Sequence, residues 1–372
     1  MKRRKKGESG QIALVGIFLL GTLWTVWVVA VRGADNGVPV RRGARGAAAP
    51  TEACAAVDVV LTWVNGSAPA HRAALAARRY AWAGGYRDYG TLRYALRSVE
   101  RHMPWARRVV LVTNGEVPAW LNASAPRLRV VAHADFFERP GEDLPTFNSN
   151  AIEASLHRVP GLAPCLLYLN DDMWLGADVR ADTFFDARGR PRVDVSPRLI
   201  APADAAARVS TWHSSVRHSN ALLQRHYYAG ADSRGRRAGA VPHRYPSHTC
   251  YAMRRDALRA VQQHWPAETR RTAAHRVRAD DDLAVPFLQM NVALEEFGAT
   301  VAHRPHRLAY GTWGPDARAN TATWRRLWAA PRLCMCLNDR LDDSPASARE
   351  IARLNSLFQE KFPTPSSFEL SS

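Results

Sequence analysis

The chain has 372 residues, of which 47% are hydrophobic and 23% charged, so it can bury the core of one large domain or two modest ones. Its formal net charge of +17 is compatible at first sight with nucleic-acid binding. Part of this charge lies near the N-terminus, and the other arginines are scattered without interleaved aromatic residues or a recognition-helix pattern. We therefore expect no nucleic-acid partner, and we attribute the positive charge to an anionic substrate or an anionic lipid surface.

The N-terminal region has the pattern of a membrane anchor followed by a stalk. Residues 1–11 form a basic leader, and residues 12–31 carry no charge over a length that spans a bilayer. The leader predicts a cytosolic N-terminus and a single-pass type II orientation. A cleavable signal peptide is the alternative, although its apolar region is usually shorter, about 7–15 residues. Residues 32–56, rich in Gly, Ala, Pro and Arg, are expected to form a flexible stalk ahead of a folded domain at 57–372.

Strand and helix patterns alternate through the first part of the folded domain. Residues 165–169 form a continuous apolar run of strand length, and residues 57–64, 108–113 and 127–132 are further strand patterns. Residues 91–103 place apolar side chains at helical spacing, and a proline ends that helix. This alternation predicts an α/β fold with a Rossmann-like, mostly parallel sheet and flanking helices.

Two adjacent carboxylates follow the apolar run at 165–169. Asn170, Asp171 and Asp172 come directly after it, so they lie at the carboxyl end of a predicted parallel strand, where open α/β sheets bind their ligands. Neighbouring carboxylates in a half-closed site repel each other unless a cation or a shared proton intervenes. Their oxygens suit Mg²⁺ or Mn²⁺. The alternative is a solvated Asp-Asp turn without a ligand.

A short helix is predicted just before this strand. Asn150 can cap it, and Glu153 stands three residues later, at the spacing of a capping box. The free N–H groups at Ser149 and Asn150 would then form a cradle for a phosphate. Glu153 keeps two interpretations, as a capping partner or as a carboxylate that works at the same edge as Asp171 and Asp172.

Five cysteines are too few and too unevenly spaced for a disulfide scaffold. In a lumen one or two disulfides are expected, and pairing of Cys250 with Cys334 or Cys336 is one option. Cys165 falls inside the predicted buried strand, so we expect it to be a core residue.

Four segments of the folded domain carry motifs in a fixed order. Residues 57–67 contain DVVLTWVNGS, and residues 87–172 contain RDYGTLRYALRSVERHMPWARRVVLVTNGEVPAWLN and end in LPTFNSNAIEASLHRVPGLAPCLLYLNDD. Residues 335–370 contain MCLNDRLDD and end in KFPTPSSFEL, and residues 241–295 follow the motif less closely. Together they resemble the four conserved blocks of the Stealth family of sugar-1-phosphate transferases. This family includes the GlcNAc-1-phosphotransferase alpha/beta subunit and bacterial capsular polysaccharide phosphotransferases.

The resemblance implies an enzyme with a nucleotide-sugar donor and a glycan or glycoprotein acceptor. It would transfer GlcNAc-1-phosphate or another hexose-1-phosphate from a UDP-linked donor to a glycan hydroxyl, and release nucleotide monophosphate. Two alternatives stay open: a metal-dependent glycosyltransferase that releases nucleotide diphosphate, and a non-catalytic, membrane-tethered glycan-binding protein. The resemblance further implies a Golgi membrane protein with a lumenal catalytic domain, and it allows a homodimer.

The resemblance also assigns roles to individual residues. The predicted catalytic residues are Arg97, Glu153, Asp172 and His248. Arg97 would contact a phosphate group, and His248, or Glu153 as the alternative, would take the proton of the attacking hydroxyl. The residues predicted to bind the nucleotide sugar are Trp63, Asn65, Gly66, Ser149, Asn150, Asn170 and Arg278. The residues predicted to hold Mg²⁺ or Mn²⁺ are Asp171, Asp172, Asn338 and Asp339.

Two of these assignments have an alternative. Trp63 either stacks on a uracil ring or belongs to the core. His243 is the other candidate for the role given to His248, because the register of the third block is ambiguous. Asp282 is expected to cap a helix at 283–295.

Overall fold

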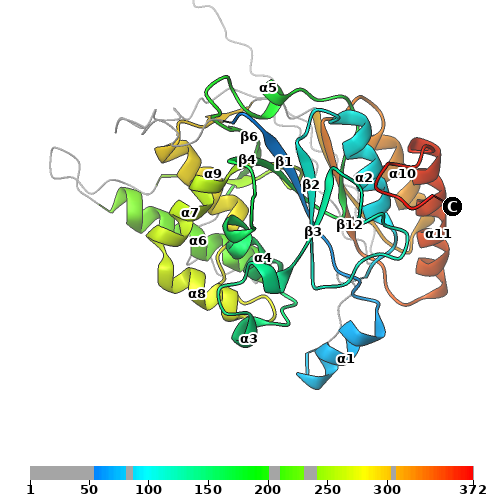
Figure 1. Cartoon of the computed structure of the whole chain (residues 1–372), viewed down its shortest axis with the longest axis horizontal. Helices are drawn as coiled ribbons and strands as arrows, with labels where there is room; N and C mark the ends of the chain where they lie inside the picture. The colour runs from blue at the N-terminus through cyan, green and yellow to red at the C-terminus, as the bar shows by residue number, and fades with distance from the viewer. Residues whose placement is uncertain (1–53, 81–86, 201–209, 230–240, 303–306, 372) are drawn as a thin grey trace, which may run out of the picture. The chain divides into compact units, whose positions relative to one another are not determined.

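The computed structural model describes residues 54–80, 87–200, 210–229, 241–302 and 307–371 (Figure 1). The predicted basic leader, the membrane anchor and most of the stalk lie outside these ranges. No helix within them is both long and apolar enough to cross a lipid bilayer.

A five-stranded sheet in the order β3-β2-β1-β4-β9 lies at the centre of the described fold (Figure 1). Its strands are β1 (Val57–Thr62), β2 (Arg108–Thr113), β3 (Leu128–Ala132), β4 (Cys165–Asn170) and β9 (Tyr251–Arg254). The first four pair in parallel, whereas β9 runs antiparallel to β4. The predicted α/β fold with a mostly parallel sheet is therefore confirmed.

Helices and short strands form the connections. The helices of the described ranges are α1 (Pro69–Ala77), α2 (Thr91–His102), α3 (Pro140–Asp143), α4 (Ser149–Ser155), α5 (Ala181–Phe184), α6 (Thr211–Tyr228), α7 (Arg255–His264), α8 (Pro266–Ala274), α9 (Val285–Glu296), α10 (Ala317–Leu327) and α11 (Pro345–Lys361), with single 3-10 turns η2 (His133–Asp135) and η3 (Leu156–Arg158). The shorter strands are β6 (Arg192–Val193), β7 (Val195–Leu199), β8 (Arg244–Pro246) and β10 (Thr300–Val301), which pair as β6 with β10 and β7 with β8. Figure 1 shows α2, α10 and α11 on one side of the central sheet, and α4 and α6 to α9 on the other.

Both faces of the central sheet are buried, which explains why its strands are mostly apolar. Val60 of β1 packs into a core that also contains Leu258 of α7 and Leu288 of α9. Its neighbour Val59 points to the opposite face, into a core that contains Leu96 of α2. Because successive strand residues alternate between faces, each strand must supply apolar side chains to both layers.

A second sheet is joined directly to the end of β4. Its strands, in order, are β11 (Leu308–Trp313), β12 (Cys334–Asp339) and β5 (Met173–Leu175). Only the turn of Asp171 and Asp172 separates β4 from β5, and β5 pairs antiparallel with β12. The Leu337 N–H donates to the Asp172 carbonyl oxygen at 3.0 Å. The carboxyl end of a parallel strand therefore meets a strand from the far C-terminal part of the chain.

Two predicted helix caps are wrong. Asn148, not Asn150, caps α4, because its side-chain oxygen accepts the Asn150 N–H at 3.0 Å. Glu153 makes its hydrogen bond elsewhere, so the capping box does not form. Helix α9 begins at Val285, and Asp282 does not cap it. Asp282 instead accepts hydrogen bonds from the side-chain amides of Asn148 and Asn150, a buried junction that ties α4 to the loop before α9.

Two disulfides link the described residues. Cys250 and Cys334, with Cα atoms 5.8 Å apart, join the start of β9 to the start of β12, and one of the two predicted pairings is thereby confirmed. Cys165 is buried, as predicted, but it is also bonded to Cys54 at the end of the predicted stalk, with a Cα separation of 5.4 Å. The last stalk residues are therefore fastened to β4, whereas Cys336 is a buried free thiol.

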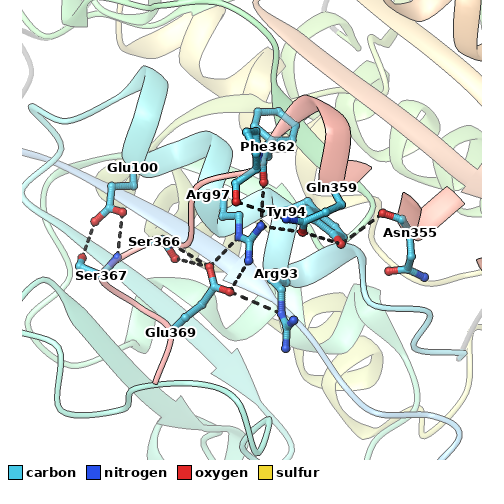
Figure 2. Close-up of polar contacts among 11 residues, drawn as sticks. Arg93, Tyr94, Arg97, Glu100, Asn355, Gln359, Phe362, Ser366, Ser367 and Glu369 are labelled. Carbon is cyan, nitrogen blue, oxygen red and sulfur yellow. Dashed lines mark hydrogen bonds and ion pairs between the residues drawn. The ribbon is translucent and has the colours of Figure 1, made fainter. Parts of the chain in front are cut away.

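The predicted phosphate contact of Arg97 is replaced by a structural role (Figure 2). Its guanidinium donates two hydrogen bonds of 2.7 Å to the two carboxylate oxygens of Glu369, and further bonds to the Gln359 side chain and the Phe362 carbonyl oxygen. Burial alone would raise the pKa of Glu369, but the hydrogen bonds from Arg97 and Ser366 and the charge of Arg97 outweigh it and lower that pKa. Arg97 thus holds the C-terminal tail against α2.

Arg97→Ala should reduce the free energy of unfolding by about 3 kcal/mol, because the nearly buried Glu369 carboxylate loses its two-armed ion pair and keeps only Arg93, at 3.6 Å, as a cationic partner. Denaturant unfolding measures this loss. Arg101→Ala on the exposed side of the same helix is the matched control and should change stability by no more than about 0.5 kcal/mol. An Arg97→Ala protein of normal stability without activity would instead support the phosphate role.

Candidate active site

Three acids from distant parts of the chain gather where the two sheets join. Asp171 and Asp172 form the turn after β4, and Asp339 ends β12. Asp172 interacts electrostatically with both other carboxylates. The sequence predicted this meeting, and the backbone bond between Leu337 and Asp172 shows how it arises: the pairing of β5 with β12 brings the two strand ends together.

Asp88 and Tyr89 belong to the same cluster, although the sequence analysis did not single them out. Tyr89 is only 8% exposed, and burial followed by the charges of Asp172 and Asp339 raises the pKa of its phenol well above the usual value. Asp88 interacts electrostatically with Asp171, and the turn at Gly90 follows both residues directly. Gly90 has a φ of +88°, and a Cβ there would lie 2.8 Å from the Asn355 side-chain oxygen, so the position requires glycine. In the sequence, the Asp-Tyr-Gly motif at residues 88–90 is the feature that could have pointed to these two site residues.

The carboxylates of this cluster are poorly solvated. Burial raises the pKa of Asp171 well above its usual range, and the neighbouring Asp172 adds to the shift. The pKa values of Asp172 and Asp339 are raised as well, chiefly by burial. Asp172 Oδ1 and Asp339 Oδ2 are buried and accept no hydrogen bond from the described residues. Such carboxylate oxygens are costly unless a cation meets them.

These donors fit Mg²⁺ or Mn²⁺. Both ions prefer oxygen ligands, and two buried carboxylate oxygens without a donor are available. Within the described ranges, the three acids do not bring three ligand oxygens within 4.8 Å of one another. Mg²⁺ is commonly held by one or two carboxylates together with substrate phosphates, so this arrangement suits a site that the substrate completes. Asn338 is partly buried beside Asp339, and its role as a ligand stays a prediction.

The structure distinguishes the two candidate histidines. His243 is buried, its Nδ1 is within hydrogen-bonding distance of Asn220 and Gln224, and burial lowers its pKa to about 4. It therefore has a structural role. His248 is partly exposed and interacts electrostatically with Asp172, and its Nδ1 has no hydrogen-bond partner among the described residues. His248 is the histidine at the acid cluster.

A buried hydrogen-bond network connects Glu153 to this edge. Glu153 is 6% exposed, and burial raises its pKa to about 7. The Tyr168 hydroxyl lies 3.1 Å from Glu153 Oε1 and 2.8 Å from Asn170 Oδ1, and Thr62 donates to Asn170 at 3.2 Å. A single phenolic proton serves one acceptor at a time. A protonated Glu153 can donate to the Tyr168 oxygen while Tyr168 donates to Asn170, so the two ends of the network are coupled.

The predicted phosphate cradle is only partly accessible. Arg278 is exposed and donates to the Ser149 hydroxyl at 2.8 Å, and its charge lowers the pKa values of both Glu153 and Asp172 against the effect of burial. The Asn150 side chain is buried and bonded to Asp282, so it holds the fold rather than a ligand. Ser149 and Arg278 remain the candidates for a phosphate contact.

The predicted nucleotide-stacking surface is wrong for Trp63. Only 4% of Trp63 is exposed, because its ring belongs to the core between β1 and α2, which is the alternative interpretation of this residue. Asn65 uses its side-chain oxygen to accept the Ser67 N–H at 3.2 Å in a local turn. Gly66 lies in the same turn, and nucleotide binding by Asn65 and Gly66 stays a prediction.

Comparison with known proteins identifies the family of this chain. Stealth protein conserved region 1 matches residues 56–79, conserved region 2 matches residues 85–193 and conserved region 3 matches residues 247–290. An exopolysaccharide phosphotransferase of Streptomyces coelicolor is 34% identical over 325 residues, which cover 84% of this chain and 52% of that protein. The chain belongs to the Stealth family.

One further relative and one solved structure also match most of the chain. The exopolysaccharide phosphotransferase CpsY of Mycobacterium tuberculosis is 30% identical over 329 residues, covering 84% of this Stealth chain and 58% of that protein. The chain thus spans about half the length of the curated relatives it matches. A crystal structure of galactosyltransferase LgtC with donor and acceptor sugar analogs covers 83% of this chain and 96% of that chain at 12% identity. The TM-score of this match is 0.40.

The Stealth regions contain most of the site. Glu153, Asp171 and Asp172 lie in conserved region 2, and His248 and Arg278 lie in conserved region 3. Three of the four predicted family blocks are therefore confirmed. The fourth block, at 335–370 with Asp339, stays a prediction, although its strand β12 completes the acid cluster in space.

Glu153→Gln should remove a pH dependence of stability from this Stealth protein. The folded-state pKa of Glu153 is raised from 4.5 to about 7, so its penalty is absent below about pH 4.5, grows between pH 4.5 and 7, and stays constant at higher pH. The free energy of unfolding should fall by about 3 kcal/mol more in the wild type than in the variant over this range. Denaturant unfolding at pH 5 and pH 8 measures the difference.

Glu360→Gln, at an exposed position of α11, is the matched control and should keep the wild-type slope. An identical pH slope in Glu153→Gln and wild type would contradict a protonated, buried Glu153.

Proposed function

We propose that this Stealth protein is an enzyme that transfers a sugar-1-phosphate from a UDP-linked sugar to a glycan hydroxyl and releases nucleotide monophosphate. The observation that carries the proposal is a pair of buried carboxylate oxygens, on Asp172 and Asp339, that accept no hydrogen bond from the described residues. The exposed guanidinium of Arg278 interacts electrostatically with Asp172. Relatives named exopolysaccharide phosphotransferases align with 84% of the chain and support this reaction class.

The reaction exchanges one phosphorus–oxygen bond for another. The acceptor oxygen attacks the β-phosphorus, the bond from that phosphorus to the bridging oxygen breaks, and the nucleotide monophosphate leaves with the electron pair. The bond between the sugar C1 and its oxygen stays intact, so the anomeric configuration of the donor is kept. The chemistry needs charge stabilisation around the β-phosphate more than stabilisation of an oxocarbenium ion.

The residues of the site divide this work. Asp172 and Asp339, with Asp171 beside them, would hold Mg²⁺ or Mn²⁺, which neutralises diphosphate charge when bound. Arg278, which already donates to Ser149, can turn its planar guanidinium to the transferred phosphoryl group and bind two of its oxygens.

His248 is the proposed general base. The partly exposed imidazole can accept the proton of the attacking hydroxyl, and the negative charge of Asp172 stabilises the imidazolium that forms. Glu153 is nearly buried and reaches the site only through Tyr168 and Asn170. We therefore assign Glu153 a positioning role, in place of the proton acceptor that the sequence left as an alternative.

The two disulfides support a location outside the cytosol. Cys54–Cys165 and Cys250–Cys334 persist only in an oxidising environment in most organisms. We propose that the described domain works in such a compartment, with residues 12–31 as its membrane anchor. The lumen of the Golgi and the outer side of a bacterial membrane both meet this condition.

Bond cleavage tests the proposal directly. With a UDP-sugar labelled in the β-phosphate, the label should appear in the glycan product as a phosphodiester, and UMP should be released. Mild acid should then liberate labelled sugar-1-phosphate from the product. Release of the label as UDP would show a glycosyltransferase and overturn the proposal, and no transfer from any donor of a nucleotide-sugar panel would favour the glycan-binding alternative.

Asp172→Asn should lower kcat by about 100-fold or more while the protein stays folded, because the change keeps the side-chain shape but removes the charge that holds the cation. Chelator should abolish wild-type activity, and Mg²⁺ or Mn²⁺ should restore it. Asp280→Asn, at an exposed position, is the matched control and should retain full activity. Full wild-type activity in chelator would remove the cation from the mechanism.

A further inference from the structure

Three helices end at one place that has no part in the proposed reaction. His226 lies in the last turn of α6, His264 is the last residue of α7, and Glu296 is the last residue of α9. We refer to these three side chains as the helix-end cluster. The helices are separated in sequence, so only their packing brings the three side chains together.

The helix-end cluster has the geometry of a set of metal ligands. One ligand atom from each side chain lies within 4.8 Å of the other two, and among the described residues no other group of three His, Cys, Asp or Glu side chains meets this condition. His264 Nε2 lies 2.6 Å from Glu296 Oε1. The imidazole rings of His226 and His264 have centroids 4.3 Å apart. Ligands of tetrahedral zinc are about 3.4 Å apart, so small side-chain rotations suffice to bind the ion.

A hydrogen bond between His264 and Glu296 accounts for the positions of only two of the three side chains in the helix-end cluster. His226 adds a second imidazole, which contacts the rings of Tyr227, His264 and Trp265 and makes no hydrogen bond within the described ranges. His226 is exposed at the helix end. An ion bound to it would therefore lie near solvent and could take a water molecule as a further ligand. A metal accounts for all three side chains at once.

The surroundings favour a cation. The carboxyl ends of α6, α7 and α9 converge here, and the free carbonyl groups at a helix carboxyl end carry partial negative charge. The Tyr227 hydroxyl donates to Glu296, which fixes the orientation of that carboxylate. Partners of this kind, one step removed from the ion, orient metal ligands in known sites.

We propose that His226, His264 and Glu296 bind a zinc ion, with water in the fourth position, and that the ion fastens the ends of α6, α7 and α9 together. Two imidazole nitrogens and one carboxylate suit Zn²⁺ rather than Mg²⁺ or Ca²⁺, which prefer all-oxygen sites. The helix-end cluster shares no residue with the acids that would hold Mg²⁺ or Mn²⁺, so the two sites are chemically distinct.

Zinc binding by the purified, chelator-treated full chain tests the proposal. Competition with a chromophoric chelator should show one tight Zn²⁺ site per chain that excess Mg²⁺ does not displace. His226→Ala removes an exposed ligand without disturbing the core, and it should weaken binding more than about tenfold. His213→Ala, on the same helix but outside the cluster, is the matched control and should bind Zn²⁺ as the wild type does. Zn²⁺ should raise the melting temperature of the wild type and of His213→Ala, but not of His226→Ala.

Two further measurements separate this site from the acid cluster. Co²⁺ in place of Zn²⁺ should give the strong visible absorption of tetrahedral coordination, and this absorption should persist in Asp172→Asn. Loss of the tight site in Asp172→Asn would place the ion at the acid cluster and overturn the proposal. Absence of a tight site in the wild type, or wild-type affinity in both His226→Ala and His264→Gln, would overturn it as well.

Discussion

The Asp172 carbonyl oxygen accepts a hydrogen bond from the Leu337 N–H, and through this contact the second sheet is attached to the end of β4. The pairing of β5 with β12 continues from it, and it brings Asp339 to the turn of Asp171 and Asp172. Without this register Asp339 would lie away from Asp171 and Asp172, and the cluster would lose its third carboxylate. The candidate site therefore depends on one antiparallel pairing between segments that are distant in sequence.

Other buried polar contacts hold the surroundings of the site. Arg97 binds Glu369 with both arms of its guanidinium and so fixes the C-terminal tail on α2, the helix that begins just after Asp88 and Tyr89 (Figure 2). On the other side, Asp282 gathers the side chains of Asn148 and Asn150 and orders the start of α4. In these contacts, charged and amide side chains of types that are common in catalytic sites have structural roles instead. A buried charge with all of its hydrogen bonds satisfied inside the protein is better explained by structure than by substrate binding.

Prediction from the sequence succeeded where a local pattern has one structural solution. The apolar runs of β1 and β4 are buried on both faces of a parallel sheet, so their pattern identified both the strands and the carboxyl edge with Asp171 and Asp172. It failed where a side chain has several possible partners. Nothing local distinguishes Asn148 from Asn150 as a cap, and nothing distinguishes a core Trp63 from an exposed one at a strand end.

The sequence by itself determined the α/β class, the parallel strands, the position of the adjacent acids and the family, because hydrophobic periodicity and ordered motifs are local properties of a chain. Only the tertiary structure decided which histidine faces the acids, that Arg97 serves the tail, that Tyr89 joins the site, and that His226, His264 and Glu296 meet. These are contacts between residues far apart in the chain. They depend on the packing of whole helices and sheets, in which each side chain takes the partner that satisfies its charge and hydrogen bonds at the lowest cost of burial.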